Sequence, residues 1–304
     1  LCKRVCYEFD ATLNLDSRSD EKPIKCLSAI NNDSVELMNA SSGAVSIELM
    51  RQCLKMGYHV VGVCYDYQND LAVTKIATTE SELLEFRGSK YFQSYTADTF
   101  REVVQDRSNR KYAIFGTPCQ IYAFSKMVRL GYTEDKYLLV DIFCHGCPSM
   151  NLWKKYVMYQ KKNAGVTKFD KIKFRSKTHA WHEFCFDFMT NSKQYSSSKY
   201  NDPFYEIFFG MDVMNEACYQ CIPRSSVKNA DIRLGDFWGW QFDTNTQGVS
   251  AVVINTKRGQ TLFGSVCEKF ETKEFSFEEV IAAQSYGKIH KYDIEKRRKN
   301  VVRY

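Results

Sequence analysis

Four cysteines in three separate segments have the residue type and the spacing expected of a metal-binding site. Cys119 lies in Gly-Thr-Pro-Cys-Gln, Cys144 begins Cys-His-Gly, and Cys218 and Cys221 form a C-x-x-C pair. The segments contain glycine, proline or aromatic residues, where a tight turn would point a thiol away from the backbone. Four converging thiolates would make a soft, closed coordination site, which suits an iron–sulfur cluster or zinc. We interpret the site as a redox centre.

A fifth cysteine, Cys147, bears on the choice of metal. It forms a second C-x-x-C pair with Cys144, and two such pairs are a zinc signature. The gap of roughly 70 residues between the pairs is far longer than the gaps in zinc ribbons. We therefore keep Cys119, Cys144, Cys218 and Cys221 as the metal ligands and interpret Cys147 as a spare thiol.

Three short segments have residue types that bind phosphates or flat rings. Ser41-Ser42-Gly43 precedes a predicted helix and offers hydroxyls and backbone N–H groups to a phosphate, although an ordinary N-cap explains the same residues. Arg87-Gly88-Ser89-Lys90-Tyr91 could clamp a pyrophosphate with two cations, or form a surface turn. The third segment is Leu234-Gly235-Asp236-Phe237-Trp238-Gly239. Its two glycines would let the backbone pack closely against a flat ring, although ordinary structural packing of Trp238 explains the same residues.

Regular α/β structure must hold these segments in place. Apolar periodicity and hydrophobic runs predict helices at 44–56, 98–107, 120–129 and 151–162, and buried strands at 58–65, 112–115 and 137–143. Such strands, separated by helices of about 10 to 15 residues, predict a mainly parallel sheet with helices on both faces. The predicted fold class is α/β.

From residue 166 the pattern changes to alternating polar and apolar residues. The segments 171–175, 183–190 and 193–198, joined by short polar turns, predict an antiparallel excursion. A helix at 203–214 leads to the C-x-x-C pair. Strands at 231–238 and 249–255 follow, with a terminal helical region after Gly259.

Composition restricts the class of protein. The 304 residues carry a net charge of +6, and no dense basic run precedes 291–303, which we interpret as a solvated helix face. Nucleic-acid binding is therefore not indicated. The 12 cysteines, several within apolar runs, favour a reducing compartment, so we expect a cytoplasmic protein. The sequence has no run of about 18 uncharged apolar residues, so we expect no membrane span.

Eight segments in order, between Lys25 and about Phe270, resemble the β subunit of the deazaflavin-coenzyme hydrogenases and dehydrogenases, a family that includes 7-hydroxymethyl chlorophyll a reductase. The segments are Ser41-Ser42-Gly43, Arg87 to Tyr91, Gly116-Thr117-Pro118-Cys119-Gln120, Asp141 to Gly146, Phe174-Arg175, Cys218 with Cys221, Leu234 to Gly239, and Gly248-Val249-Ser250. Each segment is common by itself, but the eight in this order are specific and span most of the chain.

The resemblance implies an α/β domain that holds FAD and a 4Fe–4S cluster and moves electrons or hydride to an organic acceptor. It implies cluster ligation by the four cysteines of the redox centre. The residues expected to bind FAD are Ser41, Ser42, Gly43, Arg87, Ser89, Lys90, Thr117, Asp236 and Trp238. Hydride transfer also needs a protonatable group. The candidates are His145 and His182, each with an ordinary structural alternative, and Lys90.

The resemblance extends to partners and to the beginning of the chain. We expect electrons from a ferredoxin-type donor, in the same chain or a separate one, and an unidentified small-molecule acceptor; a homo-oligomer is compatible with the sequence. Cys2 and Cys6 have the spacing of the last two cysteines in the run C-x-x-C-x-x-C-x-x-x-C-P of bacterial ferredoxins. Tyr7 departs from the proline of that run.

We therefore expect two parts in this chain. Residues 1–24 would be the tail of a ferredoxin-like module, with Cys2 and Cys6 serving a second cluster whose other ligands lie upstream. Residues 25–304 would form the FAD and iron–sulfur oxidoreductase domain. Two other functions fit the same patterns: a non-catalytic electron-transfer subunit of a larger redox complex, and a zinc-stabilised protein without flavin.

Overall fold

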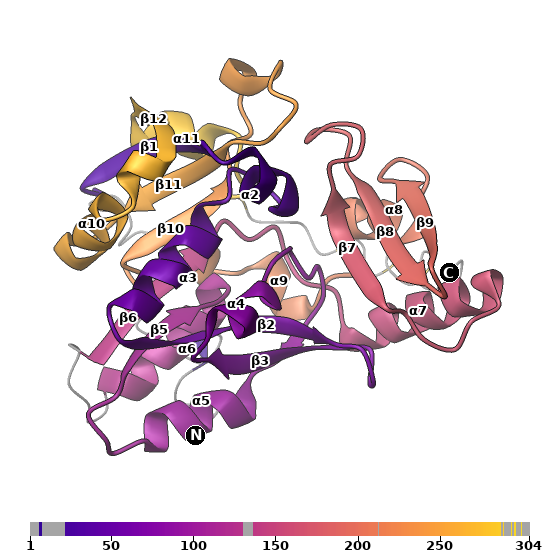
Figure 1. The fold of residues 1–304 in the computed structure, drawn as a ribbon, viewed down its shortest axis with the longest axis horizontal. Helices are drawn as coiled ribbons and strands as arrows, with labels where there is room; N and C mark the ends of the chain where they lie inside the picture. Colours follow the sequence, from indigo (N-terminus) through magenta and orange to yellow (C-terminus); the bar gives the residue numbers. More distant parts are fainter. Residues whose placement is uncertain are drawn as a thin grey trace.

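A large mixed sheet dominates the structure, a computed structural model that describes residues 6–7, 22–129, 136–211, 213–286, 288, 293, 295 and 299. In sheet order, its strands are β12 (Phe270–Phe275), β1 (Lys25–Asn31), β11 (Ser250–Ile254), β10 (Ile232–Asp236), β6 (Tyr137–Ile142), β5 (Lys111–Phe115), β2 (Tyr58–Asp66), β3 (Leu71–Ala77) and β4 (Ser94–Tyr95) (Figure 1).

The strands β1, β2, β5, β6 and β10 run in the same direction. β2, β5, β6 and β10 form consecutive parallel pairs. β1 shares this direction because two antiparallel pairings, through β11, separate it from β10. The carboxyl ends of these strands therefore lie at one edge of the sheet, which is where open α/β sheets bind ligands. We refer to it as the carboxyl edge.

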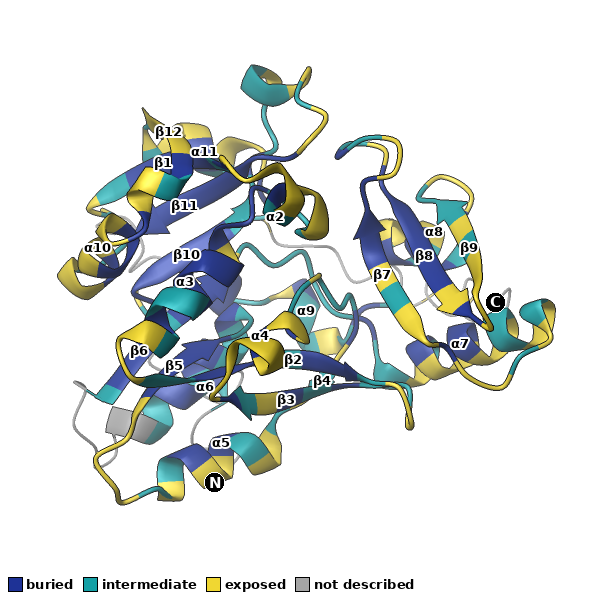
Figure 2. Cartoon of the chain, viewed as in Figure 1, coloured by how far each residue is buried: buried dark blue, intermediate teal, exposed yellow. Residues whose placement is uncertain are grey.

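Helices cover both faces of the large sheet, as Figures 1 and 2 show. The helices of this part are α2 (Ser34–Asn39), α3 (Val45–Lys55), α4 (Glu80–Leu84), α5 (Ala97–Gln105), α6 (Pro118–Arg129), α10 (Lys257–Gly264) and α11 (Phe277–Ala282). Leu49 of α3 belongs to the same apolar core as Val60, whereas Phe124 of α6 packs in a separate core with Val61. Adjacent residues of β2 thus point to opposite faces, each covered by helices.

A smaller antiparallel sheet lies beside the large one. It consists of β7 (Lys171–Ser176), β8 (Cys185–Thr190) and β9 (Lys193–Ser198), with α7 (Met150–Ala164) and α8 (Pro203–Gly210) nearby. One face buries a largely aromatic core in which Trp153, Phe174, Phe186 and Phe204 pack together. Trp153 also stacks on Phe92, with ring centroids 4.4 Å apart, and this contact joins the small sheet to the large one.

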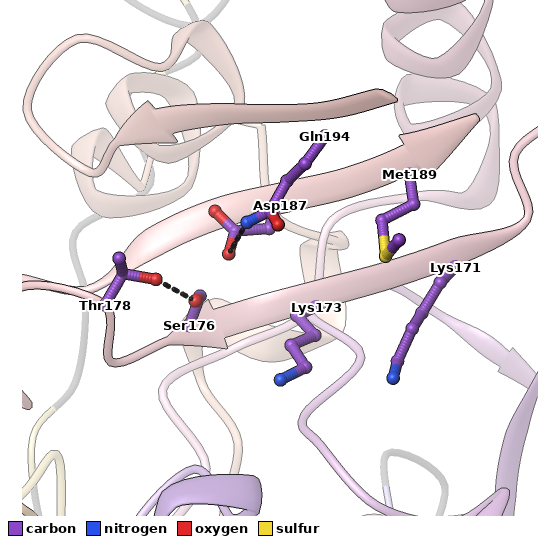
Figure 3. Close-up of a pocket in the computed structure, with 7 residues that line it drawn as sticks. All are labelled: Lys171, Lys173, Ser176, Thr178, Asp187, Met189 and Gln194. Atoms are coloured by element: carbon purple, nitrogen blue, oxygen red, sulfur yellow. Dashed lines mark hydrogen bonds between the residues drawn. The ribbon is translucent and has the colours of Figure 1, made fainter. Parts of the chain in front are cut away.

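The opposite face of the small sheet is polar and holds a shallow pocket of about 150 Å³ (Figure 3). Asp187 accepts hydrogen bonds there from Ser196 at 2.5 Å and from Gln194 at 3.3 Å. The exposed side chains of Lys171 and Lys173 lie at the same pocket. None of the residues that line this pocket was predicted to bind a cofactor.

The predicted α/β architecture is confirmed, with differences in single elements. The helix expected at 203–214 ends at Gly210, because Met211 adopts the left-handed conformation with φ 62°. The strands β1, β3 and β12 were not predicted. The terminal region expected to be helical contains β12, an edge strand whose mostly exposed, charged residues give no strand-like alternation. No described helix is long and apolar enough to cross a membrane.

Candidate functional site

The four predicted cysteine ligands converge at the carboxyl edge. Cys119 lies in the first turn of α6, directly after β5, and Cys144 follows the end of β6 by two residues. Cys218 lies on α9 (Glu216–Tyr219), and Cys221 follows that helix on the way to β10. All four are free thiols that are partly buried. Segments far apart in the sequence thus bring their thiols to one place.

Electrostatic interaction between these thiols shows that they lie close together. Burial, together with Cys221 and Cys144, raises the pKa of Cys119 to about 12. Burial, together with Cys218 and Cys221, raises the pKa of Cys144 to about 12. Burial, together with Cys119 and Cys221, raises the pKa of Cys218 to about 11. Every pair among the four cysteines therefore interacts electrostatically, and their role as ligands of one bound group stays a prediction.

Cys147 belongs to the same group as a fifth thiol. Burial raises the pKa of Cys147 well above its usual range, and Cys144 and Cys218 add to this effect. Its backbone oxygen accepts a hydrogen bond from the N–H of Asn215 at 2.9 Å and lies 3.9 Å from Sγ of Cys218. The backbone of Cys147 therefore joins two cysteine segments. Its role as a spare thiol stays a prediction.

A buried ion pair fixes the turn after Cys221. Arg233 on β10 donates from Nε and Nη2 to the two carboxylate oxygens of Asp141 on β6, at 2.7 and 2.5 Å. Its Nη2 also donates to the backbone oxygen of Ser226 at 2.7 Å. Both charged side chains are only 1% exposed. The pair thus ties the strand that leads to Cys144 to the turn that follows Cys221.

Tyr7 packs against the cysteine group. It is 9% exposed, and its hydroxyl donates a hydrogen bond to the backbone oxygen of Ala217 at 2.5 Å. Burial raises the pKa of Tyr7, and the nearby Cys221 and Cys119 raise it further. A residue from the beginning of the chain therefore covers part of the cysteine group.

A second group of side chains lies at the end of β10. Asp236 accepts hydrogen bonds from Nη1 of Arg175 at 2.5 Å and from Nε1 of Trp181 at 3.0 Å. Trp181 stacks on Trp238, with ring centroids 4.7 Å apart and an interplanar angle of 7°. The ring of His182 lies 5.5 Å from that of Trp238. We refer to Arg175, Trp181, His182, Asp236 and Trp238 as the Arg175–Trp238 group.

Phe143 and Gly235 place the two groups on neighbouring strand ends. The N–H of Phe143, the residue before Cys144, donates to the backbone oxygen of Leu234 at 2.7 Å. A Cβ atom at Gly235 would lie 2.8 Å from the ring of Phe143, so a larger residue would push the ring away. Because Asp236 follows Gly235 directly, the cysteine group and the Arg175–Trp238 group are neighbours along the carboxyl edge.

The predicted serine segment lies at the start of α3. Ala44 occupies the N-cap position with φ 65°, and no side chain caps this helix. The N–H of Gly43 donates to Oγ of Ser250 at 2.9 Å, and Oγ of Ser41 accepts the N–H of Ser89 at 3.2 Å. The structure therefore brings the two predicted phosphate-binding segments together at a helix start without a side-chain cap.

Lys177 connects the serine segment to the Arg175–Trp238 group. Its Nζ donates to the backbone oxygens of Ser42 and Leu37, at 2.7 and 2.8 Å. Burial, together with the neighbouring Arg175, lowers the pKa of Lys177 to about 7, while Asp236 opposes the shift. The serine segment, Lys177 and Arg175 thus form one continuous region.

More than half of the chain matches a known family. The family is described as the C terminus of the "coenzyme F420 hydrogenase/dehydrogenase, beta subunit", and it matches residues 109–279. This range contains the four cysteines and the whole Arg175–Trp238 group. The chain belongs to this beta-subunit family.

One curated relative and one solved structure are similar to this chain. Coenzyme F420 hydrogenase subunit beta of Methanococcus voltae is 34% identical over 76 residues, which are 24% of this chain and 27% of that protein. The matched part is thus only about a quarter of the relative's length. A chain of the F420-reducing NiFe hydrogenase complex from Methanosarcina barkeri is 20% identical and has a TM-score of 0.59, covering 93% of this chain and 92% of that chain. The second likeness shows a shared fold.

In this family member, Arg87 and Lys90 have partners within the protein. Nη2 of Arg87 pairs with Glu36 on α2, which also binds Nη2 of Arg51 at 3.1 Å. Nζ of Lys90 donates to the backbone oxygens of Arg87 and Gly88, at 2.9 and 3.1 Å, beyond the end of α4. The contacts of Arg87 and Lys90 with FAD, and a catalytic role of Lys90, stay predictions, and the structure adds a local structural role.

Other predicted residues lie beside the cysteine group. Oγ1 of Thr117 is 3.3 Å from Sγ of Cys119, and Nδ1 of His145 is 3.0 Å from Oγ of Ser285. Cys6 is partly buried, whereas Cys2 lies outside the described residues. The assignments of Thr117 to FAD, of His145 to proton transfer, and of Cys2 and Cys6 to a second cluster stay predictions.

Sequence reasoning did not assign roles to Arg175, Lys177, Arg233 and Tyr91. Phe174-Arg175 was quoted only as a segment of the family resemblance. A buried cation cannot be distinguished from a surface cation by residue type or spacing. The alternation of this segment points the wrong way, because Lys171, Lys173, Arg175 and Lys177 stand at every second position and would be predicted to share one exposed face.

Proposed function

We propose that this chain is an iron–sulfur flavoprotein oxidoreductase that passes electrons from a ferredoxin-type donor through a 4Fe–4S cluster to FAD and on to an organic acceptor. The observation that carries the proposal is the convergence of four thiols on the carboxyl edge, next to the Arg175–Trp238 group. The Arg175–Trp238 group adds a buried cation and an aromatic plane beside these thiols, which suits an enzyme that holds an organic acceptor next to its cofactors.

The cysteine group suits a 4Fe–4S cluster by residue type, although no three His, Cys, Asp or Glu side chains within the described ranges are arranged to hold one metal ion as they stand. A 4Fe–4S cluster takes its thiolates at separate iron atoms and so needs a wider arrangement than tetrahedral zinc. Arg224 lowers the pKa values of Cys144 and Cys218, against the larger effect of burial. Its positive charge would favour the thiolate forms that ligate iron.

The region between the serine segment and Trp238 fits a dinucleotide cofactor. The first turn of α3 presents N–H groups that no side chain caps, and Ser41 and Ser89 lie beside it. A helix start of this kind favours a phosphate group. Trp238 supplies an aromatic plane, and Asp236 a carboxylate, at the neighbouring strand end. We therefore propose that FAD lies along the carboxyl edge between these residues.

The cofactors would supply the electron chemistry, and the protein positions them and controls protons. We propose His182 as the residue that exchanges a proton with the acceptor. Its Nε2 lies 3.1 Å from the backbone oxygen of Phe242, which fixes the proton of a neutral ring on Nε2. Nδ1 is then the atom that gains and releases the transferred proton.

The donor side of the proposal involves the beginning of the chain. Tyr7 packs on the cysteine group, so its neighbour Cys6 also lies near the proposed cluster. We propose that residues 1–24 are the tail of a ferredoxin-like module and that 25–304 form the oxidoreductase domain. The free thiols fit a reducing compartment, so a cytoplasmic location is part of the proposal.

The colour and cofactor content of the protein test this function. Protein purified without oxygen is expected to be yellow-brown and to release FAD and iron on denaturation. The visible spectrum, extracted flavin, and iron and zinc contents should be measured on the same sample. A colourless protein that contains zinc and no flavin would overturn the proposal.

Flavin occupancy tests the serine segment. Replacing Ser41 and Ser89 together with alanine is expected to lower FAD occupancy several-fold, because both hydroxyls lie at the proposed phosphate site. Iron content should not change. The matched control is Ser81→Ala, an exposed serine on α4. Unchanged FAD occupancy in the double variant would show that the flavin does not bind at this helix start.

Exposure to air tests the covering role of Tyr7. The Tyr7→Ala variant is expected to lose its cluster absorbance several-fold faster in air than wild type, because the missing ring would admit solvent and oxygen to the cysteine group. Tyr7→Phe keeps the ring and loses only the hydroxyl contacts with Ala217 and Cys221, so it should bleach at nearly the wild-type rate. Equal bleaching rates for the alanine variant and wild type would contradict this role.

A further inference from the structure

Arg175 has an unused pair of hydrogen-bond donors in a buried position. Its side chain is 3% exposed, and its Nη1 donates to Asp236 and, at 3.4 Å, to Tyr91. Among the described residues, its Nε and Nη2 have no hydrogen-bond partner. Leaving buried charged donors unpaired costs free energy, so these two groups call for a ligand.

Arg233 shows in the same molecule which ligand such a pair fits. Nε and Nη2 lie on one edge of a guanidinium, and in Arg233 that edge binds both carboxylate oxygens of Asp141. The corresponding edge of Arg175 is unfilled. Asp236 cannot fill it as it stands, because one of its oxygens accepts from Nη1 of Arg175 and the other from Trp181. The unpaired edge therefore matches a carboxylate or a phosphate from outside the protein.

A β-bulge places Arg175 in this position. Lys173 pairs with Asp187 and Ser176 with Cys185, so β7 contains one more residue than β8 between these two pairs. Without the extra residue, Arg175 would share the exposed face of Lys171 and Lys173. Bulges commonly redirect a side chain next to a functional site. Arg175 is thus not among the residues that line the pocket of Figure 3, and its guanidinium instead contacts Asp236 at the carboxyl edge.

The surroundings of Arg175 suit an acidic ligand that carries a flat ring. The guanidinium carbon lies 4.4 Å from the ring centroid of Phe184 and 5.2 Å from that of Trp238. These rings hold the guanidinium plane in place. Asp236 contributes one negative charge, and Lys177 adds a second nearby basic group. An anion bound to Nε and Nη2 of Arg175 would thus lie against a cation that is held in place beside the indole ring of Trp238.

We propose that Nε and Nη2 of Arg175 bind a carboxylate or phosphate group of the ligand that occupies the Arg175–Trp238 group. This inference rests on the proposed function for the identity of that ligand, which is either the phosphate part of the flavin nucleotide or an acidic acceptor. Arg175 is a binding residue in this account and takes no part in the transfer of electrons.

The test compares Arg175→Lys with wild type by titration calorimetry on the full chain, with and without bound flavin. The variant should fold, because lysine keeps the positive charge opposite Asp236. It cannot bind an anion through two donors on one edge, as a guanidinium does. The matched control is Arg101→Lys, which changes an exposed arginine paired with Asp98. The probes are inorganic pyrophosphate, oxalate, FAD and riboflavin.

Wild type and the control are expected to bind pyrophosphate or oxalate at least about tenfold more tightly than Arg175→Lys, since a charged hydrogen bond of this kind contributes on that scale. If FAD affinity falls as well and riboflavin affinity does not, the anion is the cofactor's phosphate. If FAD affinity is unchanged and the flavin-loaded protein still binds the probe, the anion belongs to the acceptor.

Equal probe affinities in wild type and Arg175→Lys, or no probe binding by wild type, would overturn the inference. The probe titrations also work on a protein that contains neither flavin nor iron, so they separate this inference from the proposed function.

Discussion

Serine at any one of the four proposed ligands, Cys119, Cys144, Cys218 or Cys221, is expected to abolish the cluster absorbance and most of the bound iron. Cys147→Ser is expected to keep both. The physical reason is that all four ligands interact pairwise and would each hold one iron, and a hydroxyl is a much poorer ligand for iron in such a cluster than a thiolate. Iron content and the visible spectrum of variants purified without oxygen measure the effect.

Cys147 is a demanding control because it lies in the same group of thiols. It shares the burial of the ligands and interacts with Cys144, Cys218 and Cys119. If Cys147→Ser loses its iron and Cys119→Ser keeps it, Cys147 is a ligand of the cluster and Cys119 is not. Far-UV circular dichroism should be unchanged in every variant, so that a loss of iron can be attributed to the missing ligand.

Removing the charge of Arg233 is expected to have the largest effect on stability. Arg233→Met would leave Asp141 buried and unpaired, and breaking a buried ion pair in this way lowers the free energy of unfolding by about 3–5 kcal/mol. Because Arg233 also binds the backbone of Ser226, the turn after Cys221 should lose its support, and iron occupancy should fall. Urea unfolding of the apo protein measures the first effect, and iron analysis measures the second.

The double variant Arg233→Met with Asp141→Leu is the matched control for this loss. Replacing both charges removes the unpaired carboxylate, so most of the lost stability should return. If Arg233→Met alone unfolds at the same urea concentration as wild type, the ion pair does not stabilise the fold in the way described here. If the double variant is as unstable as the single one, the backbone contacts of Arg233 matter more than its charge.

The sequence predicted the parts of the fold that follow from periodic burial. The helix at 44–56 and the strand at 58–65 have strong apolar patterns because each packs into a core on the large sheet. β12 carried no such signal, because its residues are mostly exposed and several are charged. Backbone pairing with β1 holds this edge strand in the sheet. The end of α8 at Gly210 was missed because the left-handed conformation of Met211 is unusual for a residue other than glycine.

For the candidate site, the sequence singled out the cysteines and the serine segment as candidates, but not the residues that contact them. Turn-forming neighbours and spacing identify a thiol that can reach a metal. They do not show that Tyr7 covers the cysteine group or that Arg87 pairs with Glu36, because these contacts join segments that are distant in the sequence. The position of Arg175 depends on a β-bulge, which adds one residue to β7 and leaves no mark in residue types.

An iron and acid-labile sulfide count, combined with electron paramagnetic resonance of the dithionite-reduced protein, decides whether the four cysteines hold an iron–sulfur cluster. At least about four iron and four sulfide atoms per chain are expected, with a signal typical of a reduced 4Fe–4S cluster. Both should disappear in Cys119→Ser and persist in Cys147→Ser. A full-length protein that contains zinc, no sulfide and no such signal would contradict the assignment of the four cysteines to an iron–sulfur cluster.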